Sequence, residues 1–357
     1  MFCEIFFHTF IAPNLMKMKK LIYVMVLCSI TLTSTAQTDN GLDALLAAGV
    51  EDAERFANDY LKPGTNGIMH SMNAGWFNTA DAKPLGGFEI SIIGNGATIK
   101  NDKKSFLMDT ATYNNVQFSQ GPSSQQVGTI LGENNPDVDV IITYDDPVFG
   151  QQQVNVTLPS GLGSENIDFI PSAMIQGALG LSHGLEIKAR FVPKLNVDDS
   201  EFRLYGAALQ ADFTKWLPAD KVLPVALSGL VAYTQVDATV GLDGSTGIEG
   251  ENQRVENGTS TWLFQFIAST KLPVINFYGG IGYISGTSDS DLKGTYIVTD
   301  GIIAADPIVD PFSVSSKVSD VRGTLGAKLK LGFFRLNAEY HLSQFDVFSV
   351  GINFGFR

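Results

Sequence analysis

The feature that most constrains this chain is a strict alternation of apolar and polar side chains near its C-terminus. In residues 334–343 the alternation sets Phe334, Leu336, Ala338, Tyr340 and Leu342 against Arg335, Asn337, Glu339, His341 and Ser343. Successive side chains of a β-strand point to opposite faces, so this segment has one apolar and one polar face. The same period recurs in residues 185–191 and 321–331. The pattern predicts strands that separate a dry side from a wet side.

About ten such strands follow residue 86, at 86–98, 172–182, 185–195, 202–215, 224–240, 259–271, 274–286, 319–332, 333–344 and 346–357. A strand of about ten residues, tilted by roughly 40°, spans about 25 Å, the height of the apolar band of an outer-membrane barrel. Residues 138–144 and 153–158 indicate additional strands, which extend the barrel or form a hairpin cap. We therefore expect an all-β fold, a transmembrane antiparallel up-and-down β-barrel of 10–14 strands.

The connections between these strands differ in length. Short ones fall at 182–184, 218–221, 272–273, 332–333 and 345–346, and long, mostly acidic ones at 99–171, 242–258 and 287–318. Bacterial barrels have short periplasmic turns and long outer loops. We therefore expect every short connection on the periplasmic side and the long ones, including the insertion at 99–171, outside the cell.

Composition excludes several other classes of protein. Charged residues make up 17% of the chain, with a net charge of −13, and 44% of residues are hydrophobic, including 24 Phe. Such an acidic chain gains nothing from phosphate counterion release, so nucleic acid is excluded as a partner. The hydrophobic content argues against disorder. Only one apolar run, at the N-terminus, approaches the roughly 20 residues of a membrane-spanning helix.

That N-terminal run has the features of a secretory signal peptide. Lys17, Lys19 and Lys20 precede the apolar stretch 21–32, and small residues before Ala36 predict cleavage between Ala36 and Gln37. Residues 1–15 precede a complete signal, so we expect translation to start at Met16 or Met18. Cys3 and Cys28 both lie in the removed segment 1–36, which predicts an exported mature chain without disulfides or thiol chemistry.

Residues 40–60 carry apolar side chains at helical spacing, namely Leu42, Leu45, Leu46, Val50, Ala53, Phe56, Ala57 and Tyr60. Asp39 or Asn40 is a candidate cap, and Pro63-Gly64 is expected to end the helix. We expect residues 37–85 to form a helical, plug-like segment in the periplasmic mouth or the lumen, ahead of the barrel at 86–357.

The wet faces of the expected strands carry charges of both signs. The candidate lumen residues are Glu89, Glu186, Lys188, Arg190, Asp212, Arg322, Lys328, Lys330, Arg335, Glu339 and His341. One interpretation is an electrostatic network that fills and stiffens a narrow lumen. The other is a permeation path with a binding site. The first is favoured, and both stay open.

The residues offer little chemistry for an enzyme. No two histidines have metal-ligand spacing, and no nucleophile-elbow motif surrounds a serine. His341 and Ser343 are the one pair on a strand that resembles a serine hydrolase pair, but a polar lumen role is the stronger reading of His341. We therefore expect no catalytic residues, no metal and no cofactor.

Aromatic residues mark the ends of several expected strands. Trp216 and Trp262 suit a membrane-interface girdle, the alternative being ordinary core aromatics. The C-terminal stretch 348–357, with Phe354 and Phe356, resembles the targeting signal that the barrel-assembly machinery recognises, although Arg357 follows the last aromatic.

The mature chain as a whole resembles Gram-negative outer-membrane barrels. In plan it is similar to the long-chain fatty-acid transporter (FadL-type) family, and Asn73 to Ala80 looks like a loose version of that family's N-terminal stretch, without its Asn-Pro-Ala. The resemblance implies a channel or transporter for small, hydrophobic solutes. Secretion, adhesion or a structural role with a closed lumen is the alternative, and a membrane enzyme ranks third. The implied partners are outer-membrane lipid, lipopolysaccharide, the barrel-assembly machinery and a hydrophobic small molecule.

Overall fold

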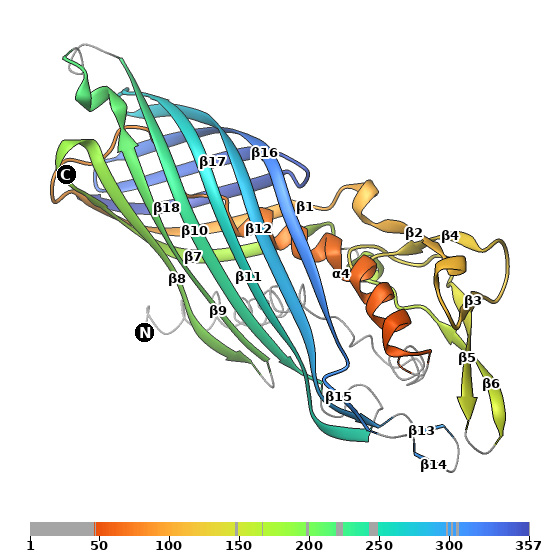
Figure 1. Cartoon of the computed structure of the whole chain (residues 1–357). Coiled ribbons are helices and arrows are strands. Elements are labelled where there is room, and N and C mark those ends of the chain that lie inside the picture. Colours follow the sequence, from red (N-terminus) through yellow and green to blue (C-terminus); the bar gives the residue numbers. More distant parts are fainter. Residues whose placement is uncertain are drawn as a thin grey trace, which may run out of the picture.

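The computed structural model describes residues 46, 48–146, 149–165, 167–197, 200–218, 224–242, 249–297, 299–300, 303–304 and 307–356. Its main feature is a closed antiparallel barrel (Figure 1). Ten strands form it, in the ring order β1 (Phe88–Thr98), β7 (Phe169–Gly180), β8 (Leu185–Val197), β9 (Ser200–Asp212), β10 (Val225–Gly241), β11 (Glu249–Thr270), β12 (Ile275–Ile297), β16 (Phe312–Leu331), β17 (Phe334–Leu342) and β18 (Val347–Phe356). Pairing of β1 with β18 and of β11 with β12 closes the ring. The barrel prediction is confirmed, at the lower limit of the expected strand number.

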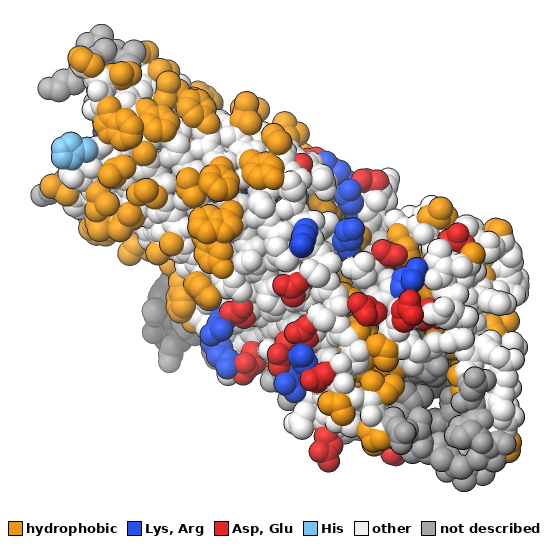
Figure 2. All heavy atoms as spheres, in the orientation of Figure 1, with side chains coloured by type: hydrophobic (Ala, Val, Ile, Leu, Met, Phe, Trp, Pro, Cys, Tyr) orange, Lys and Arg blue, Asp and Glu red, His pale blue; other side chains and the backbone are white. Residues whose placement is uncertain are grey.

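The outer surface of the barrel carries an apolar belt. Alternate residues of every strand point outward, as in β18, where Phe348, Val350, Ile352, Phe354 and Phe356 are 37–53% exposed. Figure 2 shows these side chains gathered on one half of the barrel, with Lys, Arg, Asp and Glu beyond them. A soluble protein rarely exposes so large an apolar area, whereas a bilayer requires it. Within the described residues, no helix has the length and apolar character to cross a membrane.

The two ends of the barrel differ. One, the turn end, carries the connections after β7, β9, β11 and β16, with η5 (Ser182–Gly184) and η6 (Phe213–Trp216), and receives the end of β18. The other, the lid end, carries the remaining connections. The turn at 343–346, expected with the other short ones, lies instead at the lid end, where Thr98 and Lys100 bond Asp346. Strand parity requires this, because β17 runs toward the lid end.

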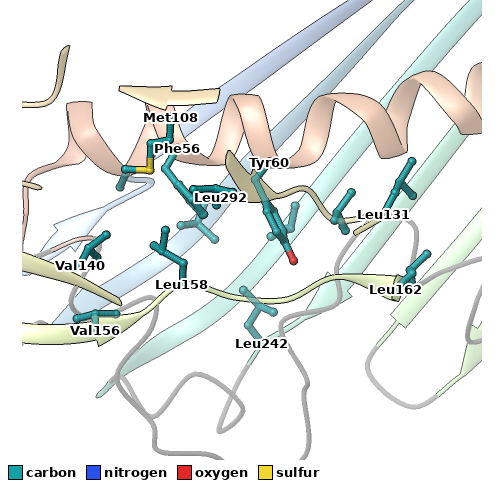
Figure 3. Close-up of a cluster of buried hydrophobic side chains, with 14 of the residues drawn as sticks. Phe56, Tyr60, Met108, Leu131, Val140, Val156, Leu158, Leu162, Leu242 and Leu292 are labelled. Atoms are coloured by element: carbon teal, nitrogen blue, oxygen red, sulfur yellow. The ribbon is translucent and has the colours of Figure 1, made fainter. Parts of the chain in front are cut away.

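A small module, the lid, stands at the lid end. It contains η2 (Asn101–Lys103), β2 (Ser105–Asp109), η3 (Thr110–Thr112), β3 (Val116–Phe118), β4 (Ser124–Gly128), β5 (Asp139–Asp146), β6 (Gly150–Thr157) and η4 (Leu162–Glu165). β2 pairs with β4, and β5 pairs with β3 and β6. The segments 138–144 and 153–158 are thus strands of the lid and do not extend the barrel. Figure 3 shows its apolar core, where Phe56 and Tyr60 meet Met108, Leu131 and Leu158.

Two long connections expected from sequence are largely strand. β11 begins at Glu249 and β12 continues to Ile297, while β16 begins at Phe312, so these strands project past the other barrel strands (Figure 1). Short strands β13 (Thr299–Asp300), β14 (Ile303–Ala304) and β15 (Ile308–Val309) follow β12. In the extensions the buried face is mixed: Asn257, Thr259 and Ser288 bond one another, whereas Val255 and Leu292 pack in the lid core. Because the two faces differ little in polarity, the sequence shows no clear period of two there.

The single long helix, α4 (Val50–Met72), also departs from expectation. Pro63 and Gly64 were expected to end it, but it continues for nine residues past Pro63. Pro63 removes only the amide that would bond the carbonyl of Asp59, and the turn after it gains a bond from the hydroxyl of Thr65 to the carbonyl of Lys62. Its first half packs in the lid core, and its last turns enter the lumen from the lid end. The expected cap, the signal peptide and Gln37 lie outside the described residues.

Candidate functional site: a plugged lumen

The lumen is occupied by the chain's own N-terminal part. The plug, residues 65–84, begins with the last turns of α4 and continues without regular structure to the turn end. There the linker that follows the plug meets β7, since the amide of Gly86 donates to the carbonyl of Gly180. The wall supplies space by using small inward residues. An added Cβ at Gly286 would lie 2.9 Å from the sulfur of Met69, and one at Gly206 3.2 Å from Trp76.

Three hydroxyl pairs tie the plug to the wall along its length. Thr65 and Ser316 of β16 have oxygens 2.6 Å apart, Ser71 and Ser172 of β7 2.9 Å, and Thr79 and Ser269 of β11 3.2 Å. Asn73 also donates to the hydroxyl of Thr261 at 2.8 Å. The interface between plug and wall is therefore mixed. Polar bonds run along its length, whereas Met69 and Phe77 pack in one apolar cluster with inward wall residues and Met72 packs in another.

Two wall arginines meet the plug where α4 ends. Arg190 of β8 donates to the carbonyls of Met72 at 2.7 Å and Ala74 at 2.8 Å, and its guanidinium lies 3.6 Å from the ring centroid of Trp76. Arg322 of β16 donates to the carbonyl of Asn73 at 2.8 Å. Both side chains are almost fully buried. Cations suit the carboxyl end of a helix, where backbone carbonyls lack partners.

A second group of charges lies nearer the turn end. Glu89 has Arg335 at 2.6 Å, Lys328 at 3.2 Å and Lys83 at 3.7 Å, and Glu186 has Lys83 and Lys188 each at 3.1 Å. Glu89 and Glu186 are buried, and so are their three lysine partners. Buried charge is stable only when it is paired and hydrogen-bonded, and this network meets that condition.

The remaining candidate residues lie apart from this group. Glu339 and His341 bond each other at 3.1 Å, and His341 also bonds Thr324. Asp212 accepts from the amide of Ala82 at 3.1 Å. Lys330 reaches the carbonyl of Leu272 at the turn end and is the most weakly held of the eleven.

The plug contributes contact residues to which the sequence analysis assigned no role. Lys83 bridges the two glutamates, Asn78 donates to Glu89 at 2.8 Å and accepts from Lys328 at 2.7 Å, and Trp76 stacks on Arg190. Trp76 and Asn78 lie in the stretch 73–80 quoted for the resemblance, but the segment shows neither helical nor strand periodicity that would predict these contacts.

The expected interface aromatics are exposed on the outer surface. Trp216 in η6 is 55% exposed at the turn end and donates its indole N–H to the carbonyl of His183. Trp262 lies on β11 beside Tyr233, where the belt gives way to the pairs Arg203–Asp237 and Arg254–Glu256. Phe356 stacks on Phe88 with ring centroids 5.1 Å apart.

The candidate hydrolase pair is not formed. His341 bonds Glu339 and Thr324, whereas the hydroxyl of Ser343 lies 3.1 Å from Nδ1 of His70 on α4. That hydroxyl donates to the carbonyl of Phe345, so its proton is not directed at the imidazole. Among the residues that the structure describes, no cluster of three His, Cys, Asp or Glu could hold a metal ion.

His70 is buried at the lid end, at the rim of the barrel. Burial lowers its pKa to about 4, even though the carboxylate of Asp320, 3.7 Å from Nε2, favours the protonated form. Nε2 has no hydrogen-bond partner in the structure. The imidazole is therefore neutral at pH 7.

Solved structures similar to this chain are outer-membrane barrels. The β-domain of the Bordetella autotransporter BrkA is 9% identical, with 76% of this chain and 100% of that chain covered and a TM-score of 0.34. The COG4313 outer membrane channel from Pseudomonas putida F1 is 10% identical, with 80% and 99% covered and a TM-score of 0.35. The translocator domain of autotransporter NalP from Neisseria meningitidis is 10% identical, with 76% and 88% covered and a TM-score of 0.25.

No curated protein matches the chain. The resemblance to the fatty-acid transporters stays a prediction. A family model, described as a family of unknown function, matches residues 17–356, and the chain therefore belongs to that family, DUF6588.

Proposed function

We propose that the protein is an outer-membrane channel of a Gram-negative bacterium for small solutes, closed in this structure by the plug. The apolar belt supports a place among outer-membrane lipid and lipopolysaccharide, and the C-terminal aromatics support insertion by the barrel-assembly machinery. Export through the cleaved segment 1–36 belongs to the same proposal.

The observation that carries the proposal is how the lumen is filled. Barrels of about eight strands fill their interior with wall side chains. Here several inward wall positions that face the plug are small, and the space between them holds a separate stretch of chain. If the plug moves aside, the remaining lumen is lined by the buried charged residues described above and by an apolar stretch that includes Leu230 and Leu263. The resemblance to fatty-acid transporters implies hydrophobic solutes, whereas the buried charges favour polar ones.

The plug has enough chain to move without leaving the barrel. Its irregular part, residues 73–84, has twelve residues, which could span about 40 Å when extended, against a belt of about 25 Å. Water can replace its hydrogen bonds and ion pairs, while the apolar contacts of Met69, Met72 and Phe77 favour the closed state. Displacement within the lumen is therefore compatible with both attachments.

A reversible lock on the plug tests this proposal. The described residues contain no cysteine, so residues 37–357 with Ser71→Cys and Ser172→Cys would carry one engineered pair. The serine oxygens are 2.9 Å apart, close to where bonded sulfur atoms about 2 Å apart would lie. In planar bilayers we expect openings from the reduced protein and silence after oxidation. Thr79→Cys with Ser269→Cys gives a second lock, and the single cysteine variants are controls.

A closed-lumen scaffold is the second candidate function. It is favoured by the dense bonding of the plug and by the lid core over the lid end, which suits a barrel that displays an external module. If the reduced, heat-modifiable and therefore folded barrel never conducts, the channel proposal fails and this candidate remains. Conductance that is equal in the oxidised and reduced proteins would also contradict gating by the plug.

A further inference from the structure

We propose that Arg190 and Arg322 form an anion-binding site in the lumen, which the backbone of the plug occupies in the closed state. When the plug moves, the channel then selects small solutes that bear a carboxylate or phosphate group. This inference rests on the proposed channel function, and it names the class of solute.

The two arginines face each other across the barrel. β8 and β16 are five strands apart in the ring of ten, which places them on opposite walls. Their guanidinium groups nevertheless converge on three consecutive carbonyls, those of Met72, Asn73 and Ala74. They therefore define one cross-section of the lumen, narrow enough for two arginines to reach the same short stretch of backbone.

The hydrogen bonds of both groups go to neutral oxygens. Besides the plug carbonyls, Arg190 donates to Gln176 at 2.9 Å and Arg322 to Gln265 at 3.4 Å. In the described part of the chain, no carboxylate is a hydrogen-bond partner of either guanidinium. Nη1 of Arg322 is buried and has no partner at all. This differs from the turn-end group, where every lysine pairs with Glu89 or Glu186.

The plug carbonyls are a weak substitute for an anion. Three carbonyl dipoles at a helix end carry partial negative charge and satisfy part of the donor set. A guanidinium offers a planar fork that matches the two oxygens of a carboxylate or phosphate, and charge-assisted bonds are roughly twice as strong as neutral ones. Withdrawal of the plug leaves the two guanidinium groups without these carbonyls, and the fork of each can then take the oxygens of an anion from solution.

Neighbouring cations extend the site toward the turn end. Lys188 lies two residues from Arg190 on the same face of β8, and Lys328 lies six residues from Arg322 on the same face of β16. A solute leaving the arginine pair toward the turn end would next meet these amines. The carboxylate of Glu339 on β17 attracts both guanidinium groups through space, but it is hydrogen-bonded to His341.

Ion selectivity is the readout that separates this site from simple helix capping. With the S71C/S172C protein reduced, the reversal potential in a KCl gradient should indicate preference for chloride, and inorganic phosphate should block the chloride current. The double variant Arg190→Gln/Arg322→Gln should lower the ratio of chloride to potassium permeability about fivefold, and phosphate should no longer block its current. Arg190→Lys with Arg322→Lys should keep the preference, because the charge remains. Arg203→Gln, an exposed cation on β9, is the matched control.

A binding measurement tests the anion site even if the barrel does not conduct. An Ala74→Cys variant of residues 37–357 carries a single cysteine beside Arg190, and phosphate should speed its reaction with a hydrophilic maleimide relative to chloride at equal ionic strength. The effect should saturate, and it should vanish in the double glutamine variant. If the barrel is silent yet phosphate accelerates labelling, the channel fails while the anion site stands. Unchanged labelling, or conductance with no preference for anions, overturns the site.

Discussion

At the scale of single residues, His70 shows how burial at the rim of the barrel changes a titratable side chain. The imidazole lies among Asp320, Arg322, Lys100 and Lys103, and its pKa of about 4 is set first by loss of solvent. In the unfolded chain a histidine takes up a proton near pH 6.5. Between pH 6.5 and 4 the unfolded state therefore binds more protons, so stability from His70 is present above pH 6.5 and is lost as the pH falls toward 4.

His70→Asn should therefore flatten the acid dependence of stability. A shift of about 2.5 pKa units corresponds to at most about 3 kcal/mol, and this part of the loss between pH 6.5 and 4 should disappear. Urea unfolding of the barrel at several pH values, followed by gel mobility, measures it. His183→Asn, at an exposed turn position, is the control. An unaltered pH slope in the His70 variant would show that another group governs the acid response.

At the scale of elements, α4 connects two environments. Its first half packs through Phe56 and Tyr60 into the lid core, and its last turns press against the wall. Gly67 marks the closest approach, because an added Cβ there would lie 2.2 Å from Cδ1 of Ile170 and 3.1 Å from the ring of Phe345. A displacement of the lid would therefore be transmitted to the plug through this helix.

A larger side chain at Gly67 should disturb the packing of α4 against Ile170 and Phe345. Gly67→Leu should destabilise the folded protein by about 1–3 kcal/mol through overpacking, and it should raise the frequency of channel openings. Lys62→Leu, an exposed position on the same helix, should change neither. The urea midpoint and single-channel recordings are the measurements. Equal midpoints for both leucine variants would mean that α4 does not lie closely against β7.

Strands could be predicted from the sequence wherever one face of the strand meets lipid and the other meets the polar lumen. The ten barrel strands follow from alternation, since lipid outside and polar groups inside impose opposite chemistry on successive residues. The projections of β11, β12 and β16 have no lipid to face, so Asn257 and Ser288 left no period to detect. The continuation of α4 beyond Pro63 and the path of residues 73–84 depend on contacts with distant strands. Local sequence carries no trace of these contacts. The roles of Lys83 and Trp76 were therefore not predicted, although their wall partners Glu186 and Arg190 were predicted to face the lumen.

At the scale of the whole molecule, the belt fixes how the barrel lies in a bilayer. Residues such as Ile281, 69% exposed, cover the half toward the turn end, and charged pairs begin where β9–β11 pass Trp262. The projecting parts of β11, β12 and β16, such as the exposed Ser315, lie on the lid side of that boundary.

A lysine in the belt should therefore cost much more than one beyond it. Ile281→Lys should destabilise the protein folded in lipid vesicles by about 2–4 kcal/mol, whereas Ser315→Lys should have little effect. Urea titration of vesicle-inserted protein provides both values. If the two lysines are tolerated equally, the apolar surface does not face hydrocarbon.

The plug also dictates an order of assembly. It is joined to β1 by only Leu85, Gly86 and Gly87, a link of about 10 Å at full extension. β1 in turn forms the closing seam with β18, the last strand made. A finished ring could not admit the segment afterwards, because both of its ends continue into folded structure. The sheet must instead close around the plug, which already lies along its inner face. Pairing of β1 with β18 is then the step that traps the plug inside the barrel.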